Sequence, residues 1–189
     1  MARPRSEDKR QAILLAAMRL FAEEGLNAPT ARIAKTAGVA EGTLFTYFAS
    51  KDELLNRLYL ELKGQLRSAM EPAPARAGLR EQVWQAWLTY VDWGVAHPQE
   101  RQVLAQLGLS DRILAATRAE GIQAFCDVSR LLEAGMAKGV LRDQPAAFVG
   151  ALMAAMADTT MDFVNHDPAA AERTREAGFA AFWNTITHG

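Results

Sequence analysis

The sequence predicts an all-α protein, and three observations support that fold class. Residues common in helices, above all Leu, Ala, Glu, Arg and Gln, dominate the composition. No run of alternating apolar and polar residues bounded by turn residues is found, so no strand is predicted. Half of the 189 residues are hydrophobic, which is enough for a substantial core in one compact domain or two closely packed ones.

Capping residues indicate where the helices of the N-terminal part begin and end. The first helix is expected over residues 6–24, because Gly25 can end it. Thr30 is the expected N-cap of the second helix. Ser50 and Glu53 have the spacing of a capping box, so a fourth helix is expected to begin there. One face of that helix is apolar and consists of Leu54, Leu55, Leu58, Tyr59, Leu62 and Leu66.

Prolines and glycines divide the rest of the chain into five more helices. The predicted breaks lie at residues 71–78, His97 and Pro98, Gly108 to Ser110, Gly139, Pro145 and Pro168. The segment between Ser110 and Gly139 is expected to form a single long helix. These breaks give a total of about nine helices.

Residues 33–48 form the most informative segment, because they have the pattern of two short helices joined by a tight turn. Ile33, Val39 and Leu44 are spaced so that the two helices can bury them jointly. Gly38 lies where the chain must adopt a positive φ to leave the first helix. The pattern is that of a helix-turn-helix, whose second helix enters DNA; an ordinary helical hairpin in a bundle core is the alternative.

The flanks of this motif add specificity. They comprise Arg10, Ile13, Leu14, Ala17, Leu20, Phe21 and Gly25 before it, and Tyr47, Phe48, Ser50, Lys51 and Leu54 at its end and beyond. With them, residues 9–55 resemble the DNA-binding domain of the tetracycline-repressor (TetR) family of bacterial transcriptional regulators. Two features depart from the family pattern. The segment from Gly25 to Ile33 is one residue shorter than in common family members. Phe45 stands where many members have a tyrosine, so a hydroxyl that could bond a phosphate is missing.

The resemblance implies nine helices, with a DNA-binding domain over residues 1–50 and a ligand-binding and dimerisation domain over residues 51–189. The residues that it implies in DNA contacts are Thr30, Arg32, Glu41, Gly42, Thr43, Phe45, Thr46, Tyr47 and Lys51. Lys51 and Tyr47 are expected to hold phosphates. Glu41 and Thr46 are expected at base edges, where a carboxylate can accept a hydrogen bond from cytosine N4.

The charge distribution agrees with DNA binding at the N-terminal end. Residues 1–67 hold eleven Lys or Arg against eight Asp or Glu, whereas the rest hold ten against fourteen. Arg3, Arg5, Lys9 and Arg10 crowd the N-terminus. Both a flexible arm that reaches DNA and a merely solvated tail are compatible with this cluster.

The predicted eighth helix is apolar almost all round over residues 146–157, which favours burial on every side. One face would pack in its own subunit and the other against a partner. The ninth helix offers a second apolar surface, which contains Phe179, Ala180, Phe182, Trp183 and Ile186. A homodimer through these two helices is therefore predicted, and it would read a palindromic operator. The alternative is a central core helix in a monomer.

A stripe of large apolar residues is the candidate ligand site. Trp84 and Trp87 share a face of the fifth helix, and the resemblance places Phe125, Met153 and Met156 on helices around the family's inducer cavity. Such a stripe fits either plain core or the wall of a pocket for a mostly apolar or aromatic molecule.

Signals for catalysis are absent from the sequence. Asp158, Asp162 and His166 recur every four residues, a spacing compatible with a metal, although an exposed polar edge is the simpler interpretation. Cys126 is the single cysteine, so the chain cannot form an internal disulfide. No constellation typical of a nucleophile, a metal or an acid–base pair is found, nor is a phosphate-binding glycine loop. Neither an enzyme nor a cofactor is predicted.

The sequence as a whole predicts a ligand-responsive, DNA-binding regulator that acts as a repressor, with activation left open. A small-molecule-binding or enzymatic helical bundle with a vestigial helix-turn-helix is the alternative. The N-terminus is too polar for a secretory signal. The apolar run at residues 146–157 is shorter than the ~20 residues that span a bilayer. A cytoplasmic protein without a membrane partner is therefore expected.

Overall fold

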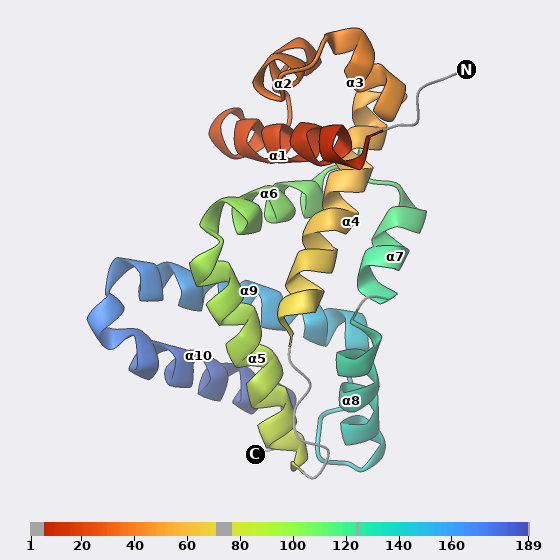
Figure 1. The fold of residues 1–189 in the computed structure, drawn as a ribbon. Helices are drawn as coiled ribbons and strands as arrows, with labels where there is room; N and C mark the ends of the chain where they lie inside the picture. The colour runs from red at the N-terminus through yellow and green to blue at the C-terminus, as the bar shows by residue number, and fades with distance from the viewer. Residues whose placement is uncertain (1–5, 71–76, 124, 189) are drawn as a thin grey trace. The chain divides into compact units, whose positions relative to one another are not determined.

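The computed structural model describes residues 6–70, 77–123 and 125–188, and its regular elements are helices (Figure 1). In chain order they are α1 (Glu7–Glu24), α2 (Thr30–Thr36), α3 (Glu41–Tyr47), α4 (Lys51–Ala69), α5 (Leu79–Ala96), α6 (Pro98–Leu109), α7 (Ala115–Gln123), α8 (Cys126–Ala137), α9 (Ala146–His166), a 3-10 turn η1 (Pro168–Ala170) and α10 (Ala171–Ile186). An isolated bridge pairs Leu141 with Thr187. The predicted all-α fold class is confirmed.

The long seventh helix of the prediction is wrong, because the chain forms two helices in that segment. Residues 110–114 are irregular, and α7 begins only at Ala115. Phe125, which precedes α8, has φ −112° and ψ 23°, outside the α-helical range. The described part of the chain therefore holds ten α-helices instead of nine.

The start of α2 also differs from the prediction. Thr30 is the first helical residue, and Pro29 occupies the N-cap position in an extended conformation. A proline side chain cannot accept a hydrogen bond from the first turn, so the short loop between α1 and α2 relies on other contacts.

The chain divides into two compact units, which we call the first unit and the second unit. The first unit comprises Met1–Gln65 and Pro98–Ile122, and the second comprises Leu66–His97 and Gln123–Gly189. The first unit thus extends beyond the expected boundary at residue 50, because α6 packs against α1. Gln102 of α6 donates a hydrogen bond to the carbonyl oxygen of Ala22 at 3.1 Å. That residues 1–50 hold the DNA-binding function stays a prediction.

The core of the first unit is built from apolar faces that the sequence identifies well. Every member of the predicted apolar face of α4 that lies in this unit is buried, as are the inner residues of α1. The Ser50 half of the capping box at the start of α4 also forms, and Glu53 reaches back to the N–H of Ala49 instead of that of Ser50. Ser50 Oγ accepts from the backbone N–H of Glu53 at 3.1 Å, and Glu53 Oε2 accepts from the N–H of Ala49 at 2.8 Å.

The core of the second unit lies where α5, α9 and α10 pack together. Trp87 is completely buried and stacks on Phe182, with ring centroids 5.7 Å apart. Its indole N–H donates to the carbonyl oxygen of Arg175 at 3.3 Å. Gly178 of α10 approaches this core so closely that a Cβ there would lie 2.2 Å from Thr160 Oγ1.

Residues 146–157 are predicted to pack on one face in their own subunit and on the other against a partner; in the single chain one face is buried, and the covering of the other stays a prediction. Val149 and Ala157 are completely buried, but Phe148 and Phe163 are 52% and 64% exposed. The cause is that α5 and α10 cover only one face of α9. This helix has 21 residues and contains an 18-residue stretch with a mean hydropathy of 1.3, a length and composition that also suit a membrane span, and 33% of that stretch is buried.

Candidate nucleic-acid interface

The helix-turn-helix predicted for residues 33–48 is present in the first unit. Ile33 of α2 and Leu44 of α3 are completely buried. Gly38 has φ 69° in the turn between them, and the next N–H, that of Val39, donates to the carbonyl oxygen of Ala34 at 2.9 Å. The glycine is needed here because an L side chain rarely adopts this φ.

The packing of α3 divides its residues between an inner and an outer face. Leu44 and the adjoining Phe48 are buried, and Thr43 and Tyr47 are half-buried. The residues that face solvent are Glu41, Gly42, Phe45 and Thr46. A helix packed on one side and open on the other can present these four residues to a groove of DNA.

Internal hydrogen bonds hold several of the predicted DNA-contact residues in place. Thr30 donates from Oγ1 to Glu41 Oε1 at 2.7 Å, which joins the start of α2 to the start of α3. The hydroxyl oxygen of Tyr47 accepts from the backbone N–H of Ser6 at 2.9 Å and so holds the start of α1. Thr46 donates from Oγ1 to the carbonyl oxygen of Gly42 at 3.0 Å.

The two predicted cationic contacts, Lys51 and Arg32, both have partners within the protein. Lys51 Nζ donates to the carbonyl oxygen of Ala28 at 2.7 Å and lies 5.8 Å from the centre of the Phe21 ring. Burial lowers the pKa of Lys51, the Arg112 charge lowers it further, and Asp52 opposes them. Lys51 therefore holds the short loop before α2. Arg32 pairs with Glu24 at 2.8 Å, with both groups at the surface.

Sequence reasoning did not identify the role of Asn56, which joins α4 to the loop before α7. Its side chain is 8% exposed. Asn56 Nδ2 donates to the carbonyl oxygens of Asp52 at 2.7 Å and Arg112 at 2.9 Å, and its Oδ1 accepts from the N–H of Leu114 at 3.0 Å. Arg112 also pairs with Asp52 at 2.5 Å. No sequence signal indicates Arg112 and Leu114 as partners, because they lie 56 and 58 residues from Asn56 along the chain.

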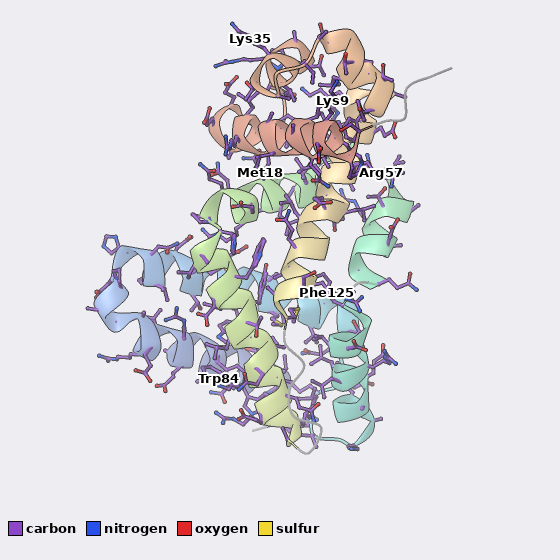
Figure 2. The ribbon with its side chains drawn as sticks, viewed as in Figure 1. Lys9, Met18, Lys35, Arg57, Trp84 and Phe125 are labelled. Atoms are coloured by element: carbon purple, nitrogen blue, oxygen red, sulfur yellow. The ribbon has the colours of Figure 1, made fainter. Side chains whose placement is uncertain are left out.

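Two exposed lysines of the first unit were also absent from the predicted contact set. Lys35 lies in the last turn of α2, and its side chain points away from the helices (Figure 2). Lys9 lies in the first turns of α1 and is exposed as well. A basic residue beside the turn of a helix-turn-helix is the signal that could have identified Lys35. Of the four candidates for an N-terminal arm, Arg3 and Arg5 lie outside the described residues, and Lys9 and Arg10 lie on α1 instead of on a flexible segment.

The five predicted ligand contacts fall in the second unit, on α5, on α9 and just before α8. Figure 2 shows Trp84 on α5 and Phe125 at the start of α8. Trp87 belongs to the core. Trp84, Met153 and Met156 are partly buried and pack against that same core. That the group lines a ligand pocket stays a prediction.

The remaining candidates are the group of Asp158, Asp162 and His166 and the single cysteine, Cys126. Within residues 6–70, 77–123 and 125–188, no three His, Cys, Asp or Glu side chains gather closely enough to hold a metal ion. The side chain of Cys126 lies outside what the structure describes.

Comparison with known proteins identifies the family of the protein. Residues 13–58 match the family model for bacterial regulatory proteins of the tetR family. The fatty acid metabolism regulator protein of Bacillus subtilis (strain 168) is 42% identical over 60 residues, which are 31% of each chain, so the chain spans about a third of this relative's length. The transcriptional regulator BetI of Rhizobium meliloti (strain 1021) is 29% identical over 181 residues, covering 83% of this chain and 88% of BetI.

The similarity to solved structures extends over the whole chain. A tetR family transcription regulator from Shewanella sp. PV-4 superposes with a TM-score of 0.87 at 30% sequence identity. The superposition covers 98% of this chain and 100% of the Shewanella chain. The protein therefore belongs to the TetR family of bacterial regulatory proteins and is a DNA-binding transcriptional regulator.

Proposed function

We propose that this regulator is a repressor that binds a palindromic operator as a homodimer and leaves it when a small, mostly apolar or aromatic molecule binds the second unit. The observation that carries the proposal is the packed helix-turn-helix, which leaves Glu41, Gly42, Phe45 and Thr46 open to solvent. Such a protein acts in the cytoplasm and needs neither a membrane partner nor catalytic activity.

The test of this function is a titration of duplex DNA from the region upstream of the protein's own gene. We expect complex formation that an excess of scrambled duplex does not reverse, because base contacts add to the phosphate contacts that every sequence offers. The competing proposal, a helical bundle with a vestigial helix-turn-helix, predicts that no complex with DNA forms even at low salt. Failure to bind at low salt would therefore overturn the repressor proposal.

The proposed contacts divide by chemistry. Lys51 and Tyr47 hold phosphates, and Lys35 and Lys9 add positive charge to the same unit. Glu41 and Thr46 face base edges. The full proposed set is Thr30, Arg32, Glu41, Gly42, Thr43, Phe45, Thr46, Tyr47 and Lys51.

Substitution of Lys51 by alanine should weaken binding to all sequences alike. Each phosphate contact contributes about 0.9 to the slope of log Kobs against log salt concentration, so the slope should become shallower by about one. The measurement is DNA affinity at several salt concentrations. Lys138→Ala, at an exposed lysine of the second unit, should leave the slope unchanged. An altered sequence preference with an unchanged slope would contradict the phosphate role of Lys51.

The proposed dimer uses the open faces of α9 and α10. Phe148 and Phe163 are the large apolar residues on the open side of α9, and Ala151 and Ala155 lie between them on the same side. Small exposed residues, including Ala180, continue the surface on α10. Small side chains allow helices of two subunits to approach closely and bury the phenylalanines.

Substitution of Ala155 by arginine should break this dimer without unfolding the subunit, because the position is exposed in the single chain. In the dimer, the arginine would be a buried and unpaired charge. It would weaken the free energy of association by several kcal/mol, more than about 2 kcal/mol. Sedimentation velocity of the variant should show a monomer. The matched control is Ala119→Arg on the exposed face of α7, which should sediment like the unsubstituted protein. An unchanged dimer for Ala155→Arg would remove α9 from the interface.

The release step needs a ligand with different affinities for two states of the dimer. A ligand that binds both states equally does not change the equilibrium between them. The coupling free energy between a ligand site and a DNA site is usually about 1–3 kcal/mol. The proposed walls are Trp84, Phe125, Met153 and Met156, and Trp87 belongs to the core against which Trp84, Met153 and Met156 pack. Among them, the partly buried Trp84 can report on ligand binding through its fluorescence.

A further inference from the structure

The outer face of α3 lacks the side chains that most often read bases in the major groove. Bidentate contacts to guanine come from Arg or Lys, and those to adenine come from Asn or Gln. The segment Glu41–Tyr47 contains none of these four residue types. Sequence selectivity of this helix must therefore come from other groups.

Phe45 is the largest side chain on that face. It is 43% exposed, whereas its neighbours on the inner face, Leu44 and Phe48, are at most 1% exposed. A phenylalanine ring offers no hydrogen-bond donor or acceptor, so it gains free energy only by covering apolar surface. In the major groove, that surface is the C5-methyl group of thymine.

Gly42 lies on the same face of α3, one position from Glu41. Its φ is not positive, and a Cβ built there would meet nothing within 4 Å. Neither backbone conformation nor internal packing thus requires glycine, although glycine within a helix costs about 1 kcal/mol relative to alanine. Close approach of a ligand is the remaining physical reason for a glycine at an exposed helical position.

Thr46 completes the face without adding a free donor. Its hydroxyl proton is used in the hydrogen bond to the carbonyl oxygen of Gly42. Glu41, the one charged residue of the helix, accepts from Thr30. The outer face around Phe45 and Gly42 therefore consists of an apolar ring and a residue without a side chain.

We propose that Phe45 determines operator sequence by packing against thymine methyl groups, and that Gly42 lets the helix approach the groove closely enough for this contact. The proposal rests on the DNA-binding function proposed above and names the base group that the recognition helix reads. Each half-site should accordingly contain thymine opposite α3.

The test replaces thymine with deoxyuridine, which removes only the methyl group. An operator is first selected from random duplexes with the purified, full-length protein, and each half-site thymine is then exchanged singly. We expect about fourfold weaker binding for each contacted methyl, the fold-change that corresponds to about 0.8 kcal/mol for one buried methyl-sized group. Phe45→Ala should bind the thymine and deoxyuridine duplexes with equal affinity. Leu15→Ala, at a side chain 49% exposed on α1, should keep the full discrimination.

The variant Gly42→Ala tests the second half of the proposal. Alanine is the better helix former, so the melting temperature should rise, while affinity for the operator should fall because the added methyl group holds the helix away from the bases. A rise in stability with unchanged affinity would overturn the role of Gly42.

The outcomes separate this inference from the function on which it rests. Selection without enrichment of any sequence would overturn both. An enriched operator that binds equally well with thymine and deoxyuridine would overturn the methyl contact and leave the repressor proposal intact. Discrimination that persists in Phe45→Ala would show that another residue reads the methyl group.

Discussion

Substitution of Trp87 by alanine is expected to lower the free energy of unfolding by about 3–5 kcal/mol, the usual cost of truncating a large buried aromatic residue. Trp87 is completely buried, stacks on Phe182 and contacts Phe179 with ring centroids 6.2 Å apart. Removal of the indole would leave a cavity between α5 and α10 and would remove the hydrogen bond to the carbonyl oxygen of Arg175. Urea unfolding followed by circular dichroism measures the change.

Trp84 provides the control, because it lies on the same helix but is only partly buried. Its ring meets Phe179 edge-on with centroids 4.9 Å apart. Trp84→Ala should therefore cost less stability than Trp87→Ala. If Trp87→Ala proved nearly as stable as the unsubstituted protein, the assignment of Trp87 to the core would be wrong, and its role as a ligand wall would gain support.

Substitution of Gly178 by alanine is expected to destabilise the second unit, although alanine is the better helix former. The added Cβ would lie 2.2 Å from Thr160 Oγ1 and 2.9 Å from a ring carbon of Trp87. Overpacking of this kind costs about 1–3 kcal/mol and occasionally more, which exceeds the about 1 kcal/mol gained in helix propensity. Differential scanning calorimetry should show a lower melting temperature.

Two further variants separate overlap from propensity. Gly64→Ala on α4 has nothing within 4 Å of the new Cβ and should raise the melting temperature slightly. Thr160→Ala removes the nearest obstructing atom, so Gly178→Ala should cost less in that background. Equal effects at Gly64 and Gly178 would contradict the close packing of α9 and α10.

The parts of the fold that sequence predicts correctly are those that local chemistry determines. Gly38 and Ser50 act within a few residues of themselves, so the turn between α2 and α3 and the start of α4 follow from the sequence. The sequence has no proline between α7 and α8. Nothing in the local sequence indicates that Phe125 adopts a non-helical conformation there.

Features that depend on distant partners were not predictable from sequence. In the sequence, nothing distinguishes Asn56 from other polar residues on a helix. Its partners are recognisable only in the folded structure, where the loop before α7 lies beside α4. Trp84 and Trp87 share an apolar face in sequence, and only the position of α10 makes Trp87 core and leaves Trp84 at its edge. Likewise, the apolar composition of α9 does not reveal which side remains open in the single chain.

The claim that two copies of this helix-turn-helix read a symmetric operator is tested most directly by hydroxyl-radical footprinting of the full-length protein on its selected operator. We predict two protected half-sites related by two-fold symmetry, with centres about 34 Å or a multiple of that distance apart, which corresponds to whole turns of DNA. The Ala155→Arg variant should lose both protections together at protein concentrations that saturate the unsubstituted dimer. A single protected half-site, or protection of any duplex without sequence preference, would contradict the account.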